Sequence, residues 1–247
     1  MSVSALASGT KQTITIPRDE RRDKPTKIMV SENRHIVLHA EEQSCSDFVM
    51  HINDANLNLA VVIENGAELT VHLLVQGGVI RQSGRVGENA KLHWKNETLG
   101  SNVKQELVSE VEGTGSESSV HWIFRACKND QLELSAKNIF KAANGRGEMI
   151  VKGVAEDHAK VSCNGMIEVG EGGVGSDVFL KEDILMLDKT AKVDALPGLE
   201  IKTNDVKASH TASVRHVSPE EIFYFASRGV DKQKAREMYR EGFLGNS

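Results

Sequence analysis

Hydrophobic and polar residues alternate along most of the chain between residues 34 and 217. The alternation begins in HIVLHA (35–40) and continues through DFVMHI (47–52) and LNLAVVI (57–63). Strict alternation over short runs is the pattern of β-strands that bury one face. The Gly, Asn and Asp residues between the runs are typical turn residues. The pattern therefore predicts many short strands over residues 34–217.

One phrase, a polar turn followed by an alternating strand, recurs through this region. It occurs at 65–71, 88–94, 116–122, 157–163 and 188–196. The spacing is too irregular for a strict solenoid repeat. It suits a parallel β-helix, in which turns vary in length and each turn of the coil buries its inward residues on its neighbours. A β-sandwich built from similar strands is the alternative.

The periodicity changes at Ser218, where the residues of a helical hairpin begin. Ser218 is a good N-cap, Pro219 suits the first helical position, and Glu221 completes a capping box. Gly229 is a typical helix stop, and Asp231 is a typical cap for a second helix. One face of that helix carries residues at helical spacing: Ala235, Met238, Tyr239 and Gly242.

The chain is thus predicted to have three parts. Residues 1–33 are polar and charged and are interpreted as a flexible or edge-lying N-terminal arm. Residues 34–217 form the β core, and residues 218–247 form the C-terminal helical hairpin.

Three motifs follow one another at the junction of the last two parts. They are P-x-L-E-I at 197–201, D-V-x-x-S-H at 205–210 and I-F-Y-F-x-S-R-G at 222–229. In this order they resemble the C-terminal core of the SufB and SufD proteins, the scaffolds of iron–sulfur cluster assembly. Several motifs in sequence are more specific than one short motif. The resemblance implies a mainly β fold, a right-handed parallel β-helix with a C-terminal α-helical hairpin, and decides against the sandwich.

The resemblance also implies a function. It describes a scaffold component of a SUF-type complex, not an enzyme, which helps to build or hold a nascent iron–sulfur cluster at a dimer interface. The dimer partner is a second copy or another SufB/SufD-like chain. In the family the C-terminal helices dock the ABC-type ATPase SufC, so a SufC-like ATPase is the expected partner. The chain has no G-x-x-x-x-G-K-[ST] loop, so ATP hydrolysis is expected in that partner.

His210, within D-V-x-x-S-H, is the cluster ligand that the resemblance singles out, and imidazole suits iron. Thiolates are the other expected ligands, and Cys163 and Cys127 are the candidates. Positive charge from Arg125 and Lys128 would favour the thiolate of Cys127. Cys163 precedes an Asn-Gly pair and is expected at a strand end.

Two positions depart from the SufB pattern. Thr211 stands where SufB proteins commonly have Glu, and Lys181 or Glu182 stands where they commonly have Cys. The usual SufB ligand set therefore does not carry over. The alternative function is a non-catalytic, SufD-like structural partner without its own cluster, in which Cys127 and Cys163 are small buried hydrophobes.

The hairpin carries more aromatic and apolar side chains than two helices bury against each other. The remainder suits a helix-in-groove surface for a partner, and the resemblance implies that this partner is the SufC-like ATPase. The predicted partner-binding residues are Ile222, Phe223, Tyr224, Arg228, Met238, Tyr239 and Phe243.

Composition narrows the remaining classes. A net charge of −5 does not suggest a nucleic-acid binder, and no apolar run reaches the ~20 residues of a membrane span. The N-terminus lacks the features of a signal peptide, and three cysteines do not suggest a disulfide framework. We therefore expect a reduced, cytoplasmic protein that binds neither nucleic acid nor membrane. A polysaccharide-acting β-helix enzyme is disfavoured because aromatic residues make up only 4% of the chain.

Overall fold

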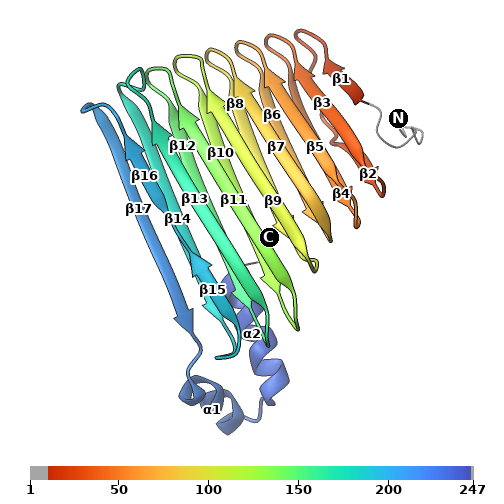
Figure 1. Ribbon diagram of the computed structural model, residues 1–247, viewed down its shortest axis with the longest axis vertical. Helices are drawn as coiled ribbons and strands as arrows, with labels where there is room; N and C mark the ends of the chain where they lie inside the picture. The colour runs from red at the N-terminus through yellow and green to blue at the C-terminus, as the bar shows by residue number, and fades with distance from the viewer. Residues whose placement is uncertain (1–10, 246–247) are drawn as a thin grey trace.

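The strands of the protein stack into a parallel β-helix (Figure 1). A computed structural model describes residues 11–245, apart from the side chains of Pro219 and Ile222. The chain alternates between two sheets, and neighbouring strands in each sheet are parallel. One strand from each sheet makes one turn, here called a rung. The predicted parallel β-helix with a C-terminal helical hairpin is confirmed.

Sheet A holds the odd-numbered strands up to β15 together with β16, and sheet B holds the even-numbered strands up to β14 together with β17. Sheet A consists of β1 (Lys11–Ile16), β3 (Arg34–Ala40), β5 (Leu57–Ile63), β7 (Gly78–Val86), β9 (Val103–Val111), β11 (Gln131–Phe140), β13 (Lys160–Val169), β15 (Lys192–Ala195) and β16 (Gly198–Ile201). Sheet B consists of β2 (Thr26–Val30), β4 (Cys45–Ile52), β6 (Glu68–Val75), β8 (Lys91–Thr98), β10 (Glu117–Ala126), β12 (Arg146–Ala155), β14 (Ser176–Met186) and β17 (Val206–His216).

The core is the inside of the coil, where alternate residues of every rung meet. Val71, Trp94, Val120 and Met149 occupy register-matched positions on successive strands of sheet B, and all are buried. Fully burying such a side chain contributes about 1.5–3 kcal/mol. Because each rung lies on the one before it, the alternation seen in the sequence becomes one continuous core.

The two ends of the coil differ in what continues beyond them. At the first rung, β1 and β2 lie at the edges of the sheets, within the stretch interpreted as an edge-lying arm. At the last rung, β15 pairs with the first half of β13 and β16 with the second half. The strand is interrupted at Pro197, which has no N–H to donate to the ladder. β17 completes this rung and pairs only with β14 among the strands of its sheet.

The hairpin consists of α1 (Pro219–Ser227) and α2 (Lys232–Leu244). The predicted capping box is present: the Glu221 N–H donates to Ser218 Oγ at 3.2 Å, and the Ser218 N–H donates to the Glu221 carboxylate at 2.7 Å. Gly229 has a φ of 78°, as a helix stop requires, and Asp231 caps α2 through the N–H of Lys234. Neither helix in the described part of the chain is long and apolar enough to cross a membrane.

The packed face of α2 differs from the predicted one. Ala235 is buried, and Tyr239 and Phe243 are partly buried against the C-terminal ends of β12 and β14. Met238 and Gly242 are exposed. The spacing of the packed residues is i, i+4, i+8, so the helix lies slightly rotated from the face that the sequence suggested. The residues of the β-helix in this contact are buried and apolar: Val154, Leu185 and Leu187.

Candidate functional site

The last rung leaves one end of the β-helix uncovered. No strand within the described residues pairs with the outer edges of β15, β16 and β17. The residues of β17 are exposed along almost the whole strand, although their register partners on β14 are largely buried. We call this surface, formed by β15, β16 and β17, the open end. It combines unpaired backbone groups with exposed apolar side chains such as Ile201 and Val214.

His210 lies at the open end, on the inward-facing side of β17. It is in register with Leu180, which points into the core, so the imidazole points the same way but has no rung beyond it. The side chain of His210 is consequently exposed. Thr211, which replaces the Glu of SufB proteins, is in register with Lys181 and points to the outside.

Cys163 and Glu182 lie one rung inside the open end. Cys163 is buried in the middle of β13, not at a strand end as the sequence suggested. The Asn-Gly pair that follows it continues the strand and makes no turn. Glu182 faces the core from β14 and is 1% exposed. In the last rung, Ala195 is in register with Cys163 and Ala212 with Glu182.

The buried carboxyl group of Glu182 has unusual surroundings. Neither of its oxygens has a hydrogen-bond partner of normal geometry among the described residues. Burial raises the pKa of Glu182 to about 7, although the nearby backbone of Gly165 acts in the opposite direction. Burial, and then the charge of Glu182, raises the pKa of the Cys163 thiol. Sequence reasoning noted this position only as a missing Cys. The alternation of apolar residues on either side of Glu182 could have predicted that its side chain is buried.

Cys127 lies at the corner between β10 and β11, and its predicted activation is wrong. Burial, followed by the charge of Asp130, raises the pKa of the thiol and outweighs the opposing effect of Arg125. The thiol is therefore not held as a thiolate by its surroundings. Within residues 11–245, the structure shows no group of three or more His, Cys, Asp or Glu side chains placed to hold a metal ion. It therefore does not bring Cys127, Cys163 and His210 together as a ligand set in one chain.

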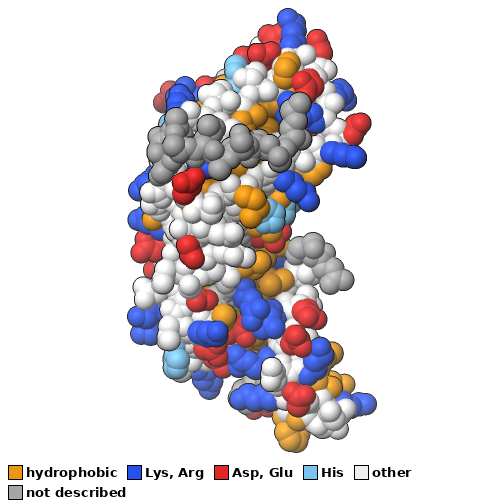
Figure 2. Space-filling view, turned by 90° about the vertical axis from the view of Figure 1, so that its right-hand side faces the viewer, with side chains coloured by type: hydrophobic (Ala, Val, Ile, Leu, Met, Phe, Trp, Pro, Cys, Tyr) orange, Lys and Arg blue, Asp and Glu red, His pale blue; other side chains and the backbone are white. Residues whose placement is uncertain are grey.

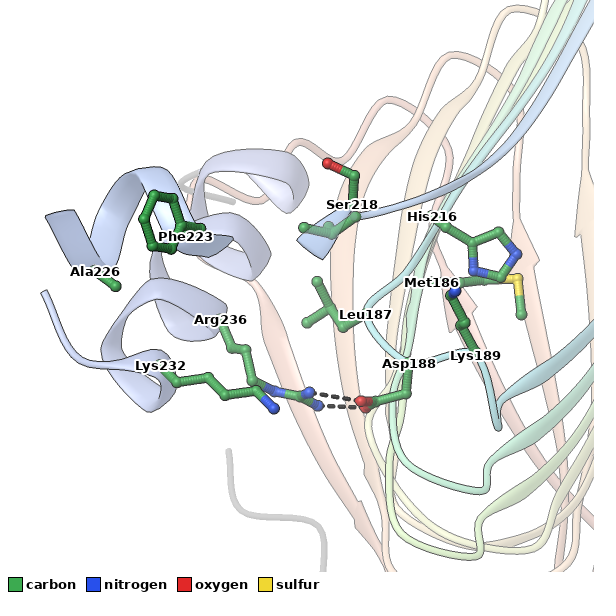
Figure 3. A pocket seen from close by; sticks show the side chains of 11 residues that line it. Met186, Leu187, Asp188, Lys189, His216, Ser218, Phe223, Ala226, Lys232 and Arg236 are labelled. Carbon is green, nitrogen blue, oxygen red and sulfur yellow. Dashed lines mark hydrogen bonds and ion pairs between the residues drawn. The ribbon is translucent and has the colours of Figure 1, made fainter. Parts of the chain in front are cut away.

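Charged side chains attach the hairpin to the β-helix. Arg236 of α2 donates to both carboxylate oxygens of Asp188, which follows β14, in a bidentate pair (Figure 3). Arg240 and Arg125 both bind Glu156, at 2.9 and 3.1 Å, and Glu156 is buried. The hydrogen bonds from Arg236 lower the pKa of Asp188 to about 2. Sequence reasoning missed this network. The i, i+4 spacing of Arg236 and Arg240, which places both on one face of α2, was the only local indication of it.

Asp188 also ends a ladder of hydrogen bonds from backbone N–H groups to Asp carboxylates at one corner of the coil. The N–H of Lys128 donates to Asp157, and the N–H of Asp157 donates to Asp188 at 2.7 Å. Lys128 and Asp157 both have positive φ. The Asp188 carboxylate is the last acceptor of this ladder, and it accepts from the guanidinium of Arg236 as well as from the Asp157 N–H.

A cavity of about 490 Å³ lies between the hairpin and the ends of β14 and β17. Figure 3 shows Phe223 and Ala226 on the hairpin side of this cavity and Leu187 on the side of the β-helix. Figure 2 shows hydrophobic side chains on the outside of the hairpin among charged ones. Of the predicted partner-binding residues, four are exposed: Phe223, Tyr224, Arg228 and Met238. Tyr239 and Phe243 are partly buried, and the side chain of Ile222 lies outside the described residues.

The family assignment follows from a match that covers most of the chain. Residues 24–243 match the model of the SufBD core domain of the SUF system for FeS cluster assembly. The chain belongs to the SufBD family. This membership confirms the resemblance seen in the motifs, supports a role in iron–sulfur cluster assembly, and fits an assembly component of the scaffold type.

Relatives of known family confirm this assignment over a shorter stretch. Proteins named iron–sulfur cluster assembly SufBD family protein from Staphylococcus saprophyticus, Staphylococcus epidermidis and Staphylococcus aureus are each 31% identical to this chain over 160 residues. The alignment covers 64% of this SufBD chain and 34% of each relative. The matched part thus spans about a third of the length of these relatives.

Proposed function

We propose that this SufBD chain is a scaffold component of a SUF-type assembly complex, in which two β-helices join at their open ends. The observation that carries the proposal is the uncovered last rung, with His210 exposed on its inward side. An unpaired strand edge beside exposed apolar side chains is a surface that proteins pair or cover. The second chain is another copy of this one or a related SufB/SufD-like chain.

The nascent iron–sulfur cluster is the cargo of this interface. His210 supplies a labile imidazole ligand, and Cys163, one rung behind it, and Cys127 are the thiol candidates. Because the described residues of one chain gather no three-ligand group, the ligand set is completed by the second chain. All three cysteines are free, which fits a reducing compartment and hence the expected cytoplasmic location.

The hairpin is the proposed docking site of a SufC-like ATPase. Phe223 and Tyr224 of α1 and Met238 of α2 are exposed hydrophobic side chains, and Phe223 also lines a cavity that a partner can enter. The hairpin is anchored to Asp188, which directly follows the strand that pairs with β17. Movement of the hairpin by the ATPase would therefore reach the open end through β14. ATP hydrolysis belongs to the partner, and the SufBD chain is not an enzyme.

Anaerobic co-expression with a SufC-like ATPase tests the whole proposal. The complex is separated by size-exclusion chromatography with mass determination, and its iron and acid-labile sulfide are measured. The expected result is a complex containing two β-helix chains, two ATPase chains, iron and sulfide. A monomeric chain that binds neither the ATPase nor iron would contradict the proposal.

Paired variants assign each surface. Val214→Asp at the open end should abolish the pairing of β-helices, whereas Val108→Asp, at a similarly exposed position on the outside of sheet A, should not. His210→Ala should lower cluster yield, whereas His121→Ala on the outside of sheet B should leave it unchanged. If the two variants of either pair had equal effects, the open end would not be the surface on which the β-helices pair or the cluster binds.

A matched pair also tests the hairpin. Phe223→Ala should weaken binding of the ATPase, because this side chain is 73% exposed and has little packing of its own to lose. Met29→Ala, at the opposite end of the β-helix, removes a comparably exposed apolar side chain and should not change binding. ATPase affinity is measured by calorimetry with the intact SufBD chain.

Two departures from the SufB pattern favour a second candidate function: Thr211 replaces one usual ligand, and Lys181 or Glu182 replaces another. In that case the chain is a SufD-like structural partner without a cluster of its own. Cys163→Ser and Cys127→Ser would then leave complex formation and cluster yield unchanged, and iron would appear only when a second scaffold chain is present. Iron and sulfide in a complex of this chain and the ATPase alone exclude this alternative.

A further inference from the structure

Glu182 is a buried carboxyl group that the scaffold function leaves unused. It points from β14 into the β-helix, is 1% exposed, and within the described part of the chain neither of its oxygens has a hydrogen-bond partner of normal geometry. An unpaired carboxylate in an apolar interior costs several kcal/mol. A group of this kind therefore stays protonated or binds a positive charge. Around it, the structure offers other side chains able to complete a site for such a charge.

Sulfur-containing side chains lie near the carboxyl group of Glu182 inside the coil. Gly165 lies two residues after Cys163 on β13, so both face the core on the same strand. A Cβ at Gly165 would lie 2.5 Å from Glu182 Oε1 and 3.2 Å from Met149 Sδ. Glycine at this position thus leaves room that the carboxyl and the thioether share. Burial, and then the charge of Glu182, raises the pKa of the Cys163 thiol, which faces the core two residues before Gly165.

We propose that Cys163 and Glu182 are the two charged ligands of a buried site for one divalent transition-metal ion within a single chain, with the Met149 thioether beside them. On binding, the ion displaces the proton of the thiol and any proton of the carboxyl group. The thiolate and carboxylate together balance the two positive charges, so the complex is neutral inside the apolar core. Sulfur donors favour an ion such as Fe²⁺, Co²⁺ or Zn²⁺ over Mg²⁺ or Ca²⁺.

The open end gives this site an entry path. The residues of the last rung that lie over Cys163 and Glu182 are alanines, Ala195 and Ala212, and Ala212 is exposed. Small side chains leave only a thin layer between the site and solvent, and the remaining coordination positions are filled from this side by water or an incoming ligand. The site goes beyond the proposed scaffold function because it needs no second chain, ATPase or sulfide.

Titration with Co²⁺ tests the site in the full-length chain. The background is Cys45→Ser with Cys127→Ser, which leaves Cys163 as the only thiol. Co²⁺ is added anaerobically, without sulfide or ATPase, and the absorption spectrum is recorded. We expect one Co²⁺ per chain with a thiolate-to-cobalt charge-transfer band. Adding Cys163→Ser should abolish the band, and Glu182→Gln should weaken binding at least tenfold.

Matched controls separate binding from folding. Glu168→Gln changes a carboxylate on the outside of β13, where it pairs with Lys137 and Lys202, and should leave Co²⁺ affinity unchanged. Glu182→Gln keeps the shape of the side chain and removes its charge, and circular dichroism checks that each variant is folded. In the unmutated chain, excess Co²⁺ should raise the melting temperature, because it binds only the folded state, and Cys163→Ser should remove this rise.

Two results would overturn the proposal: no charge-transfer band in the single-thiol background, or equal Co²⁺ affinity after Glu182→Gln. These failures are distinct from failure of the scaffold function. A complex that loads iron and sulfide while the isolated chain ignores Co²⁺ retains the scaffold and rejects the internal site. Co²⁺ binding by a chain that neither pairs nor loads sulfide would retain the internal site and reject the scaffold function.

Discussion

The last rung of the β-helix and the rung just inside it have the same alternating pattern in opposite surroundings. Ile184 on β14 and Val214 on β17 are register partners and point in the same direction. Ile184 is fully buried, whereas Val214 is 46% exposed. The difference between them is whether another rung follows. In this fold, alternation determines which way a side chain points, and the neighbouring rung determines whether it is buried.

The largest expected contrast is between an aromatic ring inside the coil and one on the hairpin. Phe124 is fully buried, and its ring occupies the space in front of Gly153. Phe124→Ala should cost about 3–5 kcal/mol of unfolding free energy, whereas Phe223→Ala in the isolated chain should cost less than about 0.5 kcal/mol. Urea unfolding of both variants gives the values. A comparable loss for Phe223→Ala would mean that the hairpin belongs to the core.

The next contrast concerns charge inside the coil and depends on pH. Because burial raises the pKa of Glu182 to about 7, the folded chain keeps a proton between pH 4.5 and 7 that the unfolded chain has lost. The folded state therefore loses stability as the pH rises through this window, by at most about 3 kcal/mol. Glu182→Gln should recover up to this amount at pH 8 and nothing below pH 4.5.

Urea unfolding in the presence of a chelator, at pH 4.5, 6 and 8, measures this effect without bound metal. Glu168→Gln serves as the control, because its outward carboxylate has a lowered pKa owing to Lys137 and Lys202. A gain for Glu182→Gln that is the same at every pH would show that the buried group does not titrate in this range.

A smaller and local loss is expected where the hairpin meets the β-helix. Arg236→Gln removes the bidentate pair with Asp188 but leaves Arg240 and Arg125 on Glu156. The free energy of opening the hairpin should fall by about 2 kcal/mol, because a partly buried charge pair is broken. Amide hydrogen exchange in α2 should then accelerate about 30-fold, with exchange in β8 and β10 unchanged. Uniform acceleration would show that hairpin and coil open together.

The smallest effect is expected for a pair on the outside of sheet B. His121 Nε2 lies 2.6 Å from Glu148 Oε1, and both side chains are nearly half exposed. Such pairs contribute about 0–1 kcal/mol, so Glu148→Gln should change the unfolding free energy by less than about 0.5 kcal/mol. Thermal unfolding at low and high salt checks this, and a loss above 2 kcal/mol would show that outward ladders matter as much as the core.

The sequence predicted those features of the fold that depend on residues close together in the chain. The alternation at 57–63 predicts β5, and Ser218 with Glu221 predicts the start of α1. His210 lies in the motif just before the predicted hairpin, and the structure places it in the last rung. Each of these signals involves residues within one element or one turn, where a short pattern suffices.

Features that join distant parts of the chain were not predictable in the same way. Arg236 and Asp188 are 48 positions apart in the sequence, and Arg240 and Glu156 are 84 apart. Nothing local indicates that these charges meet. The Asn-Gly pair after Cys163 was interpreted as a strand end, because such pairs usually make turns. Here it continues β13, and the missing side chain of Gly165 accommodates Glu182 from the opposite strand. That requirement exists only when the two sheets face each other.

Because Arg236 pairs with Asp188 near the last rung, the attachment of the hairpin does not depend on how many rungs precede it. The described contacts of α2 with the coil lie in its last few turns and include those with Val154, Glu156, Leu185, Leu187 and Asp188. A rung added or removed near β6 would move none of these contacts, so a longer or shorter coil can carry the same terminus unchanged. The protein is in this sense modular, because the number of rungs can change without changing how the hairpin is attached.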